Sequence, residues 1–321
     1  MRALALTAAL LGGWLAQPAY AATDAPQWLD RMAQAEQQKS FQGTFVYERS
    51  GSFSTHDIWH LADNGKVTER LLQLDGSAQE IVRVGGLAQC VSGTLVAGVG
   101  EGAQGSRQVL DPLKLMSWYD LAVGGQSRVA GRDAVVVTFR PKDAYRYGFE
   151  MHLDKQTGLP LKSLLVSDKG QLLERFQFTR FAPTVPDDAA LKASANCKAI
   201  PVAAPVQPVV VHWHSEWMPP GFVLTGARIT TDGKGAGPKG KSLFSSQTYS
   251  DGLAGLTVFF EPLSDTPAAD IRTQLGPTSA VSRHLVTPKG DVLITVVGEI
   301  PMGTAERIAL SMRPDDAQAT Q

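Results

Sequence analysis

Serine, histidine and acidic residues are the side chains that could perform catalysis in this chain, so their spacing comes first. The G-x-S-x-G pattern, which places a nucleophilic serine on a sharp strand-to-helix turn, does not occur. Ser92 and Ser117 have no identifiable base partner. Glu150 and Glu174 could pair for acid–base chemistry, but charged side chains that face solvent are far commoner. The sequence therefore predicts no catalytic residues, and a protein that is not an enzyme.

A metal site is the next possibility, because His212 and His214 lie two positions apart and would point to the same side of a strand. Such a site needs a third ligand, and Glu216 is only one weak candidate on that side. Residues 100–105 match a dinucleotide-binding glycine pattern, but no helix signal follows them. The sequence therefore predicts no metal ion and no cofactor.

Cys90 and Cys197 are the two cysteines of the chain. In an oxidising compartment, two cysteines in one secreted chain are more often bridged than free. A bridge would close a loop of about a hundred residues and strongly restrict the unfolded chain. The alternative of two buried free thiols in separate places is left open by the sequence.

The composition is that of an ordinary globular protein with 321 residues, 43% of them hydrophobic. At about 150 residues to a domain, this length predicts about two domains. The 30 Lys and Arg residues balance 31 Asp and Glu residues, which leaves a formal charge of −1. Nucleic-acid binding needs a basic excess or a basic stripe, so the sequence predicts no nucleic-acid partner.

The first residues have the features of a bacterial secretory signal. A basic Arg2 precedes an apolar run over residues 3–15, and Ala19 and Ala21 are placed for cleavage after residue 21. The apolar run is shorter than the roughly 20 residues of a membrane-spanning helix. We therefore expect a signal peptide over residues 1–21 and export of the mature chain to the periplasm.

The remaining chain divides by composition. Residues 22–182 are predicted to form an N-terminal domain, and residues 183–208, rich in Pro and Ala, are predicted to form a linker. A smaller second domain is predicted over residues 209–313, followed by a polar tail over 314–321.

Hydrophobic periodicity predicts the elements of both domains. Near the N-terminus it indicates a helix that begins near Trp28 and a strand in which Phe41, Phe45 and Tyr47 alternate. A helix capped by Asp111 is predicted next. An antiparallel meander follows, with strands over residues 135–139, 145–153, 159–166 and 171–181. In the second domain we expect strands over 222–229, 253–261 and 292–297, and helices over 268–275 and 304–310.

Several segments are similar to the RseB/MucB family of periplasmic regulators. In the N-terminal domain they are residues 41–49 (FQGTFVYER), 128–132 (RVAGR), 145–150 (YRYGFE) and 153–162 (LDKQTGLPLK). In the second domain they are residues 217–222 (WMPPGF), 249–254 (YSDGLA) and 258–262 (VFFEP). These segments occur in order over nearly the whole mature chain, so the resemblance is specific.

The resemblance implies a β-rich α+β fold. Its N-terminal domain would be an unclosed antiparallel half-barrel with helices, shaped like the carriers LolA and LolB, and its C-terminal domain would be smaller. It also implies that the protein binds the periplasmic segment of a membrane anti-sigma factor and shields it from proteolysis. The envelope-stress sigma factor would then stay inactive until a lipid or lipopolysaccharide signal releases the complex; in pseudomonads such regulators control alginate production. A lipid or lipoprotein carrier is the alternative function, and a homo-oligomer remains possible.

Two sets of residues are candidate binding sites. Acyl chains are predicted to contact the alternating apolar face formed by Phe45, Tyr47, Phe149, Met151 and Phe176. The anti-sigma segment is predicted to contact an aromatic and proline-rich surface formed by Trp213, Trp217, Pro219, Pro220 and Phe222. For each set there is an alternative: core packing in the first case, and seating of the C-terminal domain in the second. Lys234, Lys239 and Lys241 could attract lipopolysaccharide phosphates.

Overall fold

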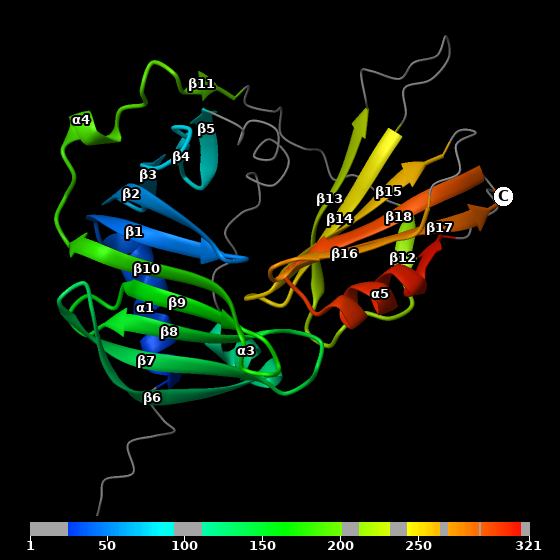
Figure 1. Cartoon of the computed structure of the whole chain (residues 1–321), viewed down its shortest axis with the longest axis horizontal. Helices are drawn as coiled ribbons and strands as arrows, with labels where there is room; N and C mark the ends of the chain where they lie inside the picture. The colour runs from blue at the N-terminus through cyan, green and yellow to red at the C-terminus, as the bar shows by residue number, and fades with distance from the viewer. Residues whose placement is uncertain are drawn as a thin grey trace, which may run out of the picture.

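A computed structural model describes residues 25–92, 111–200, 212–231, 243–263, 269–288 and 290–315, which form two β-rich domains (Figure 1). The signal sequence, the glycine pattern at 100–105 and the three lysines at 234, 239 and 241 lie outside these residues. No helix among the described residues is long and apolar enough to cross a membrane.

The N-terminal domain is one antiparallel sheet whose strands follow the order β11-β5-β4-β3-β2-β1-β10-β9-β8-β7-β6. The bounds are β1 Phe41–Arg49, β2 Ser52–Asp63, β3 Lys66–Gln73, β4 Glu80–Val84, β5 Leu87–Val91, β6 Tyr119–Val129, β7 Arg132–Pro141, β8 Gly148–Asp154, β9 Pro160–Val166, β10 Leu172–Ala182 and β11 Lys198–Ala199. Because β11 and β6 do not pair with each other, the sheet stays unclosed. This is the half-barrel that the resemblance implied.

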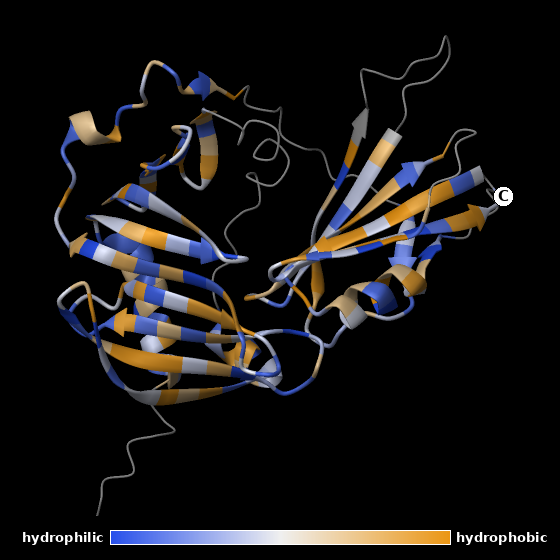
Figure 2. Cartoon of the chain, in the orientation of Figure 1, coloured by the Kyte–Doolittle hydropathy of each residue, from blue (hydrophilic) through white to orange (hydrophobic). Residues whose placement is uncertain are grey.

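Two helices pack on one face of this sheet, α1 (Ala25–Gln38) and α3 (Pro112–Trp118). Leu29 and Met32 of α1 are buried with Val137 and Leu153 of the sheet. Hydrophobic and hydrophilic residues both occur along the strands of this sheet (Figure 2). In β1, Phe41 and Phe45 are buried and the residues between them alternate in burial, as the sequence predicted. Asp111 caps α3 by accepting the amides of residues 113 and 114, as its position before a proline indicated.

Residues 183–200 differ from the predicted linker, because most of them pack against the N-terminal sheet. Helix α4 (Asp188–Leu191) is followed by β11, which pairs with β5. Buried Glu80 accepts hydrogen bonds from Ser194, and Arg70 donates to the carbonyl of Ala190 at 2.9 Å. Proline and alanine content could not reveal these distant polar partners.

Cys90 of β5 and Cys197, next to β11, form a disulfide with an S–S distance of 2.07 Å. The bridge closes a separation of 107 residues and fastens the end of this segment to the edge of the sheet. Among the described residues there is no free cysteine.

The C-terminal domain is a six-stranded antiparallel sheet in the order β13-β14-β15-β18-β17-β16, with a two-stranded sheet beside it. The bounds are β12 Trp213–Ser215, β13 Val223–Thr231, β14 Leu243–Ser250, β15 Gly255–Pro262, β16 Ile271–Leu275, β17 Thr278–Thr287, β18 Gly290–Gly298, α5 Met302–Ser311 and β19 Met312–Pro314. Helix α5 covers one face of the sheet, and its Ile308 is buried against Val296 and Phe260.

The helix predicted over residues 268–275 is wrong, because residues 271–275 form the edge strand β16. They pair with β17 from Ile271 opposite Ser282 to Leu275 opposite Thr278, and Gly276 turns the hairpin with a φ of 58°. All five residues of β16 are exposed. Strand pairing has decided the structure here over local helix propensity.

Candidate interaction site at the domain junction

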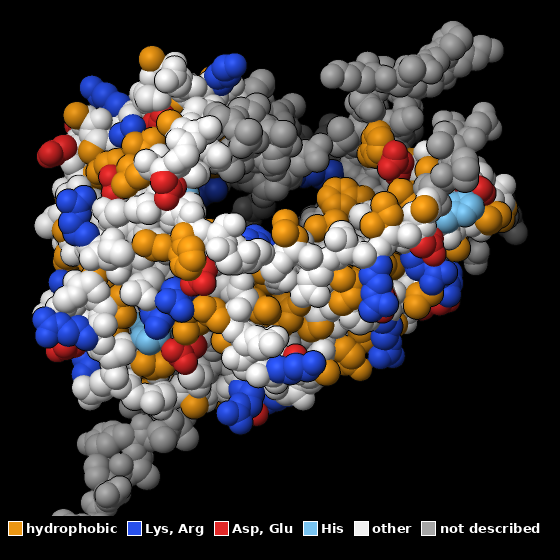
Figure 3. Space-filling model, in the orientation of Figure 1, with side chains coloured by type: hydrophobic (Ala, Val, Ile, Leu, Met, Phe, Trp, Pro, Cys, Tyr) orange, Lys and Arg blue, Asp and Glu red, His pale blue; other side chains and the backbone are white. Residues whose placement is uncertain are grey.

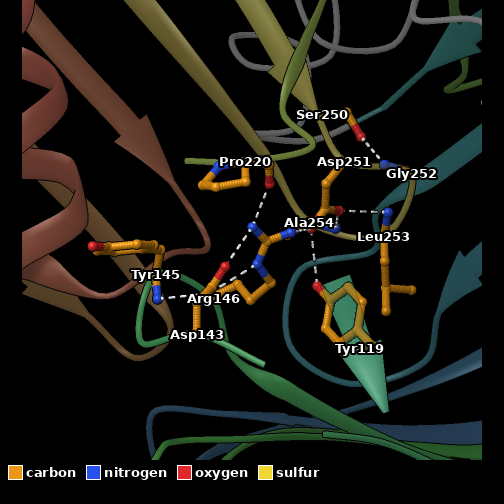
Figure 4. Close-up of polar contacts among 10 residues, drawn as sticks. All are labelled: Tyr119, Asp143, Tyr145, Arg146, Pro220, Ser250, Asp251, Gly252, Leu253 and Ala254. Carbon is orange, nitrogen blue, oxygen red and sulfur yellow. Dashed lines mark hydrogen bonds and ion pairs between the residues drawn. The ribbon is translucent and has the colours of Figure 1, made fainter. Parts of the chain in front are cut away.

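Three of the segments that carried the family resemblance meet where the two domains touch (Figure 4). Arg146 comes from the loop before β8, Pro220 from the turn before β13, and Asp251 from the turn between β14 and β15. The meander strand predicted from residue 145 begins only at Gly148. The Asp143 carboxylate accepts the Tyr145 amide at 3.0 Å and so holds the loop out of the sheet.

Arg146 is the centre of this junction, and its guanidinium bonds groups from both domains. It donates to the two carboxylate oxygens of Asp143 at 3.1 and 2.9 Å, and to the Pro220 carbonyl at 2.6 Å. It also donates to Asp251 Oδ2, and neither the Arg146 nor the Asp251 side chain is accessible to solvent. Loss of one partner of a buried charge pair is strongly destabilising, because the other charge stays buried without a partner. Each domain therefore needs the other to keep its buried charge paired.

The protonation states favour this arrangement. Burial lowers the pKa of Arg146, but hydrogen bonds and charges from Asp143 and Asp251 outweigh it, so its pKa lies above the ordinary value. The Tyr119 hydroxyl donates to Asp251 Oδ2 at 3.1 Å. Burial and the Asp251 charge raise the pKa of Tyr119, so it remains a neutral donor. The Asp251 carboxylate also accepts the amides of Leu253 and Ala254, which shapes its own turn.

Aromatic rings enclose the guanidinium of Arg146. The ring centroids of Trp118, Tyr119 and Phe222 lie 5.2 to 5.8 Å from its central carbon. Gly221, with a φ of 88°, lies against the Trp118 indole so closely that a β-carbon would overlap it. Glycine is therefore required at 221 for both its backbone conformation and its missing side chain.

A second contact joins the domains at the turn between β1 and β2. Arg49 pairs with Glu299 at 3.2 Å and bonds the Thr278 hydroxyl, and Tyr147 donates from its hydroxyl to the Ile300 carbonyl at 3.2 Å. A cavity of about 390 Å³ opens beside this contact. Burial and the nearby Glu174 raise the pKa of Glu299, although Arg49 partly offsets them.

The residues predicted to bind the anti-sigma segment mostly seat the C-terminal domain. Phe222 is buried in its core, and Trp213 stacks on Phe260 at 4.7 Å between ring centroids. Trp217 contacts the Tyr145 ring of the other domain edge-on, and Arg307 lies 3.9 Å over it. Pro219 is buried, whereas Pro220 is exposed. Contact of these five residues with a partner stays a prediction.

The residues predicted to bind acyl chains share one face of the N-terminal sheet but divide between two packed clusters. Phe149 and Met151 pack with α1 and α3. Phe45 is buried, and Tyr47 and Phe176 pack beside it. Burial raises the pKa of the Tyr47 phenol above its ordinary value, and the nearby Glu174 acts in the same direction. Their role in lipid binding stays a prediction.

A serine–histidine–carboxylate chain was missed by the sequence reasoning. Ser127 of β6 bonds Nδ1 of His152, and Nε2 of His152 bonds Glu150, at 2.7 and 2.8 Å. Hydrolase triads join the serine to Nε2 instead. Burial lowers the pKa of His152, although its bond to Glu150 acts in the opposite direction. The chain links β6 to β8 across β7. His214, a possible metal ligand by its spacing from His212, pairs with Asp315, and no group of three or more metal-binding side chains occurs among the described residues.

Sequence reasoning also missed Tyr119, Arg146 and Asp251 as functional residues. The signal available was that YRYGFE and YSDGLA, which contain Arg146 and Asp251, both carry the family resemblance. Without the fold, nothing indicated that these segments contact each other.

The fold and the junction together define a two-domain protein, an open half-barrel locked to a smaller α+β domain. Models of the MucB/RseB N-terminal and C-terminal domains match residues 24–195 and 207–313. The chain therefore belongs to the MucB/RseB family.

Similar proteins are regulators of sigma factors. The sigma factor AlgU regulatory protein MucB of Pseudomonas aeruginosa is 52% identical over 96% of each chain. The sigma-E factor regulatory protein RseB of Escherichia coli K12 is 25% identical over 90% of this chain and 91% of its own.

Solved structures agree with the fold. The Pseudomonas aeruginosa MucA/MucB complex, 52% identical, covers 92% of this chain and all of that chain with a TM-score of 0.81. The crystal structure of MucB in complex with MucA(peri) has a TM-score of 0.78 at 52% identity. That match also covers 92% of this chain and all of that chain. A crystal structure of MucB has a TM-score of 0.68 at 51% identity, and the match covers 92% of this chain and 99% of that chain.

Proposed function

We propose that this protein is a periplasmic regulator that binds the periplasmic part of a membrane anti-sigma factor. Binding shields that segment from regulated proteolysis and so keeps the envelope-stress sigma factor inactive. The observation that carries the proposal is similarity over both domains to MucB, which has been solved in complex with MucA(peri).

The arrangement of the two domains supports the same function. A high TM-score over 92% of the chain requires both domains to superpose together, and the two complexes with MucA give higher TM-scores than the crystal structure of MucB. The Arg146 junction holds the domains in this arrangement.

We place the anti-sigma contact at the C-terminal side of the junction. Pro220 is exposed there, and the neighbouring side chains of Val223 and Leu224 are also exposed, at 56% and 52%. Hydrophobic side chains also reach the surface of the C-terminal domain on the face shown in Figure 3. Exposed apolar side chains of this kind, together with the partly buried Trp213 and Trp217 of the same domain, suit contact with an apolar peptide segment.

We place the lipid signal in the half-barrel, on the face formed by Phe45, Tyr47, Phe149, Met151 and Phe176. This face is apolar, but α1 and α3 already pack on it. An acyl chain would therefore bind only after a helix moves, and this cost gives the ligand a way to change the state of the protein.

The test uses the purified mature chain and an immobilised anti-sigma periplasmic domain. We expect capture, slower cleavage of the captured domain by its regulatory protease, and release on addition of lipopolysaccharide. Lack of capture would refute the regulatory function. A lipid or lipoprotein carrier would instead bind acyl ligands and leave the anti-sigma domain unprotected.

A further inference from the structure

Helix α3 is shared between the half-barrel and the domain junction. Its Leu115 is fully buried with Leu29 of α1 and Phe139 of β7, on the face predicted to take acyl chains. The next strand begins at Tyr119, which is buried in the same cluster and donates its hydroxyl to Asp251 of the other domain. One short element thus carries contacts to both regions.

The C-terminal domain reaches into that same cluster. Leu253, two residues after Asp251, packs against it together with Phe149 and Met151, two of the predicted lipid-binding residues. Gly252 faces Leu115, whose side chain would lie 3.7 Å from an added β-carbon. An acyl chain placed beside Phe149 and Met151 would therefore compete for space with α3 and Leu253.

The far end of α3 is tied to the Arg146 loop. The Lys142 amide and ammonium donate to the carbonyls of Trp118 and Met116, at 2.9 and 2.6 Å. Trp118 also forms the surface against which Gly221 fits. A shift of α3 would disturb Trp118, Tyr119 and the loop together, so it would reach every polar contact of Arg146.

We propose that α3 transmits occupancy of the half-barrel to the domain junction. An acyl chain that displaces α3 removes the surface on which Leu253 packs and breaks the hydrogen bond from Tyr119 to Asp251. The C-terminal domain is thereby released. The inference rests on the proposed lipid signal and adds the element that carries it.

Thermodynamic reciprocity gives this proposal a test. If acyl binding and junction closure oppose each other, a variant that weakens the junction populates the open state more and must bind the acyl ligand more tightly, by the factor by which the open fraction rises. Coupling between sites is commonly about 5-fold or more. A change at Asp251, a residue of the C-terminal domain, should therefore raise the affinity of the half-barrel for the acyl ligand.

The experiment measures binding of cis-parinaric acid, an 18-carbon fatty acid whose fluorescence rises in apolar sites, to the full mature chain. The variants are Asp251→Asn, which is isosteric, and Tyr119→Phe, which removes only one hydroxyl from the junction. Asp291→Asn is the matched control, since it alters the pair with His284 within the C-terminal domain. Spin labels at Lys66 and Val286 report the distance between the domains.

We expect the affinity for cis-parinaric acid to rise about 5-fold or more in D251N, less in Y119F and not at all in D291N. The acid should also lengthen the label distance in the wild type. Equal affinity in the wild type, D251N and Y119F would overturn the proposal while leaving the regulatory function intact. No binding to any of these chains would overturn both the transmission and the lipid signal, and anti-sigma capture would still test the regulator.

Discussion

The guanidinium of Arg146 and the carboxylate of Asp251 form an ion pair that joins the two domains. Both side chains are closed to solvent, and the two residues are 105 positions apart in the chain. Neither charge is left without polar partners. Asp143 and the Pro220 carbonyl complete the bonds of Arg146, while Tyr119 and two backbone amides complete those of Asp251. Such a network favours one relative placement of the domains, because a shift of either domain would leave buried charges unpaired.

Replacement of Arg146 by methionine should open the junction without unfolding either domain. The loss leaves Asp251 buried without its countercharge, which costs about 3 to 5 kcal/mol of docking free energy. Spin labels at Lys66 and Val286 should report longer and broader distances. Arg272→Met, which breaks an exposed pair with Glu306, is the control and should leave the distances unchanged. An unaltered distance distribution in R146M would contradict the role given to this residue.

Gly221→Ala should weaken the junction by a different mechanism. The new methyl group would overlap the Trp118 indole, and a φ of 88° costs an alanine about 1 to 2 kcal/mol by itself. Gly170→Ala is the matched control, since its φ is 73° and nothing lies within 4 Å of an added β-carbon. In the same distance measurement G221A should resemble R146M, whereas G170A should resemble the wild type. Similar behaviour of the two alanine variants would mean that the Trp118 contact is unimportant.

Glu80→Gln should loosen residues 188–199 and remove one source of acid sensitivity. Burial raises the pKa of Glu80, but hydrogen bonds from Ser194 and Arg70 outweigh it, so its folded-state pKa lies below the ordinary value. The stability it contributes is complete above the unfolded-state pKa of about 4.3 and disappears as the pH falls through the folded-state value.

At neutral pH the loss of these charge-assisted bonds should cost about 1.5 to 3 kcal/mol in urea unfolding. The difference between the wild type and E80Q should shrink below about pH 4.3. A difference that stays constant down to the acid transition would show that the Glu80 carboxylate is not the group responsible.

Removal of the disulfide by a C90S/C197S double substitution should destabilise the N-terminal domain. For a closed loop of this length the chain-entropy model gives about 4 to 5 kcal/mol, an upper figure. Thermal unfolding with and without a reductant provides the check. The reductant should lower the melting temperature of the wild type and leave the double variant unaffected. Equal melting temperatures of oxidised and reduced wild type would contradict the prediction.

The parts of the fold that the sequence predicted are those that depend on local patterns. Strict alternation placed β1, and Asp111 before proline placed the start of α3. The second domain followed from the change in composition after residue 208, whereas the unclosed half-barrel was implied only by the family resemblance. In contrast, the helix predicted over residues 268–275 is wrong, because pairing of β16 with β17 outweighs the local helix propensity of this segment.

The junction could not be predicted from local patterns either, because it is formed by residues that are distant in the sequence. The sequence predicts Arg146 within a strand over residues 145–153, and only its contacts with Asp251 and Pro220, both distant in the chain, make it a buried residue of the junction. Residues 188–199 looked like linker because Glu80, to which they bind, is more than a hundred positions away.

Attachment of residues 198–200 to β5 also limits how far the domains can part. The amide of Ile200 is still bound to the Gln89 carbonyl, and His212 already belongs to the C-terminal domain through Asp315. Twelve peptide steps separate these two residues, so the tether reaches at most about 40 Å. A released C-terminal domain therefore stays within that distance of its attachment, so its return to the junction is an intramolecular step. If residues 183–200 also detached from the N-terminal sheet, the connection would begin at Ala182 and could extend to about 100 Å. The C-terminal domain would then return to the junction less often.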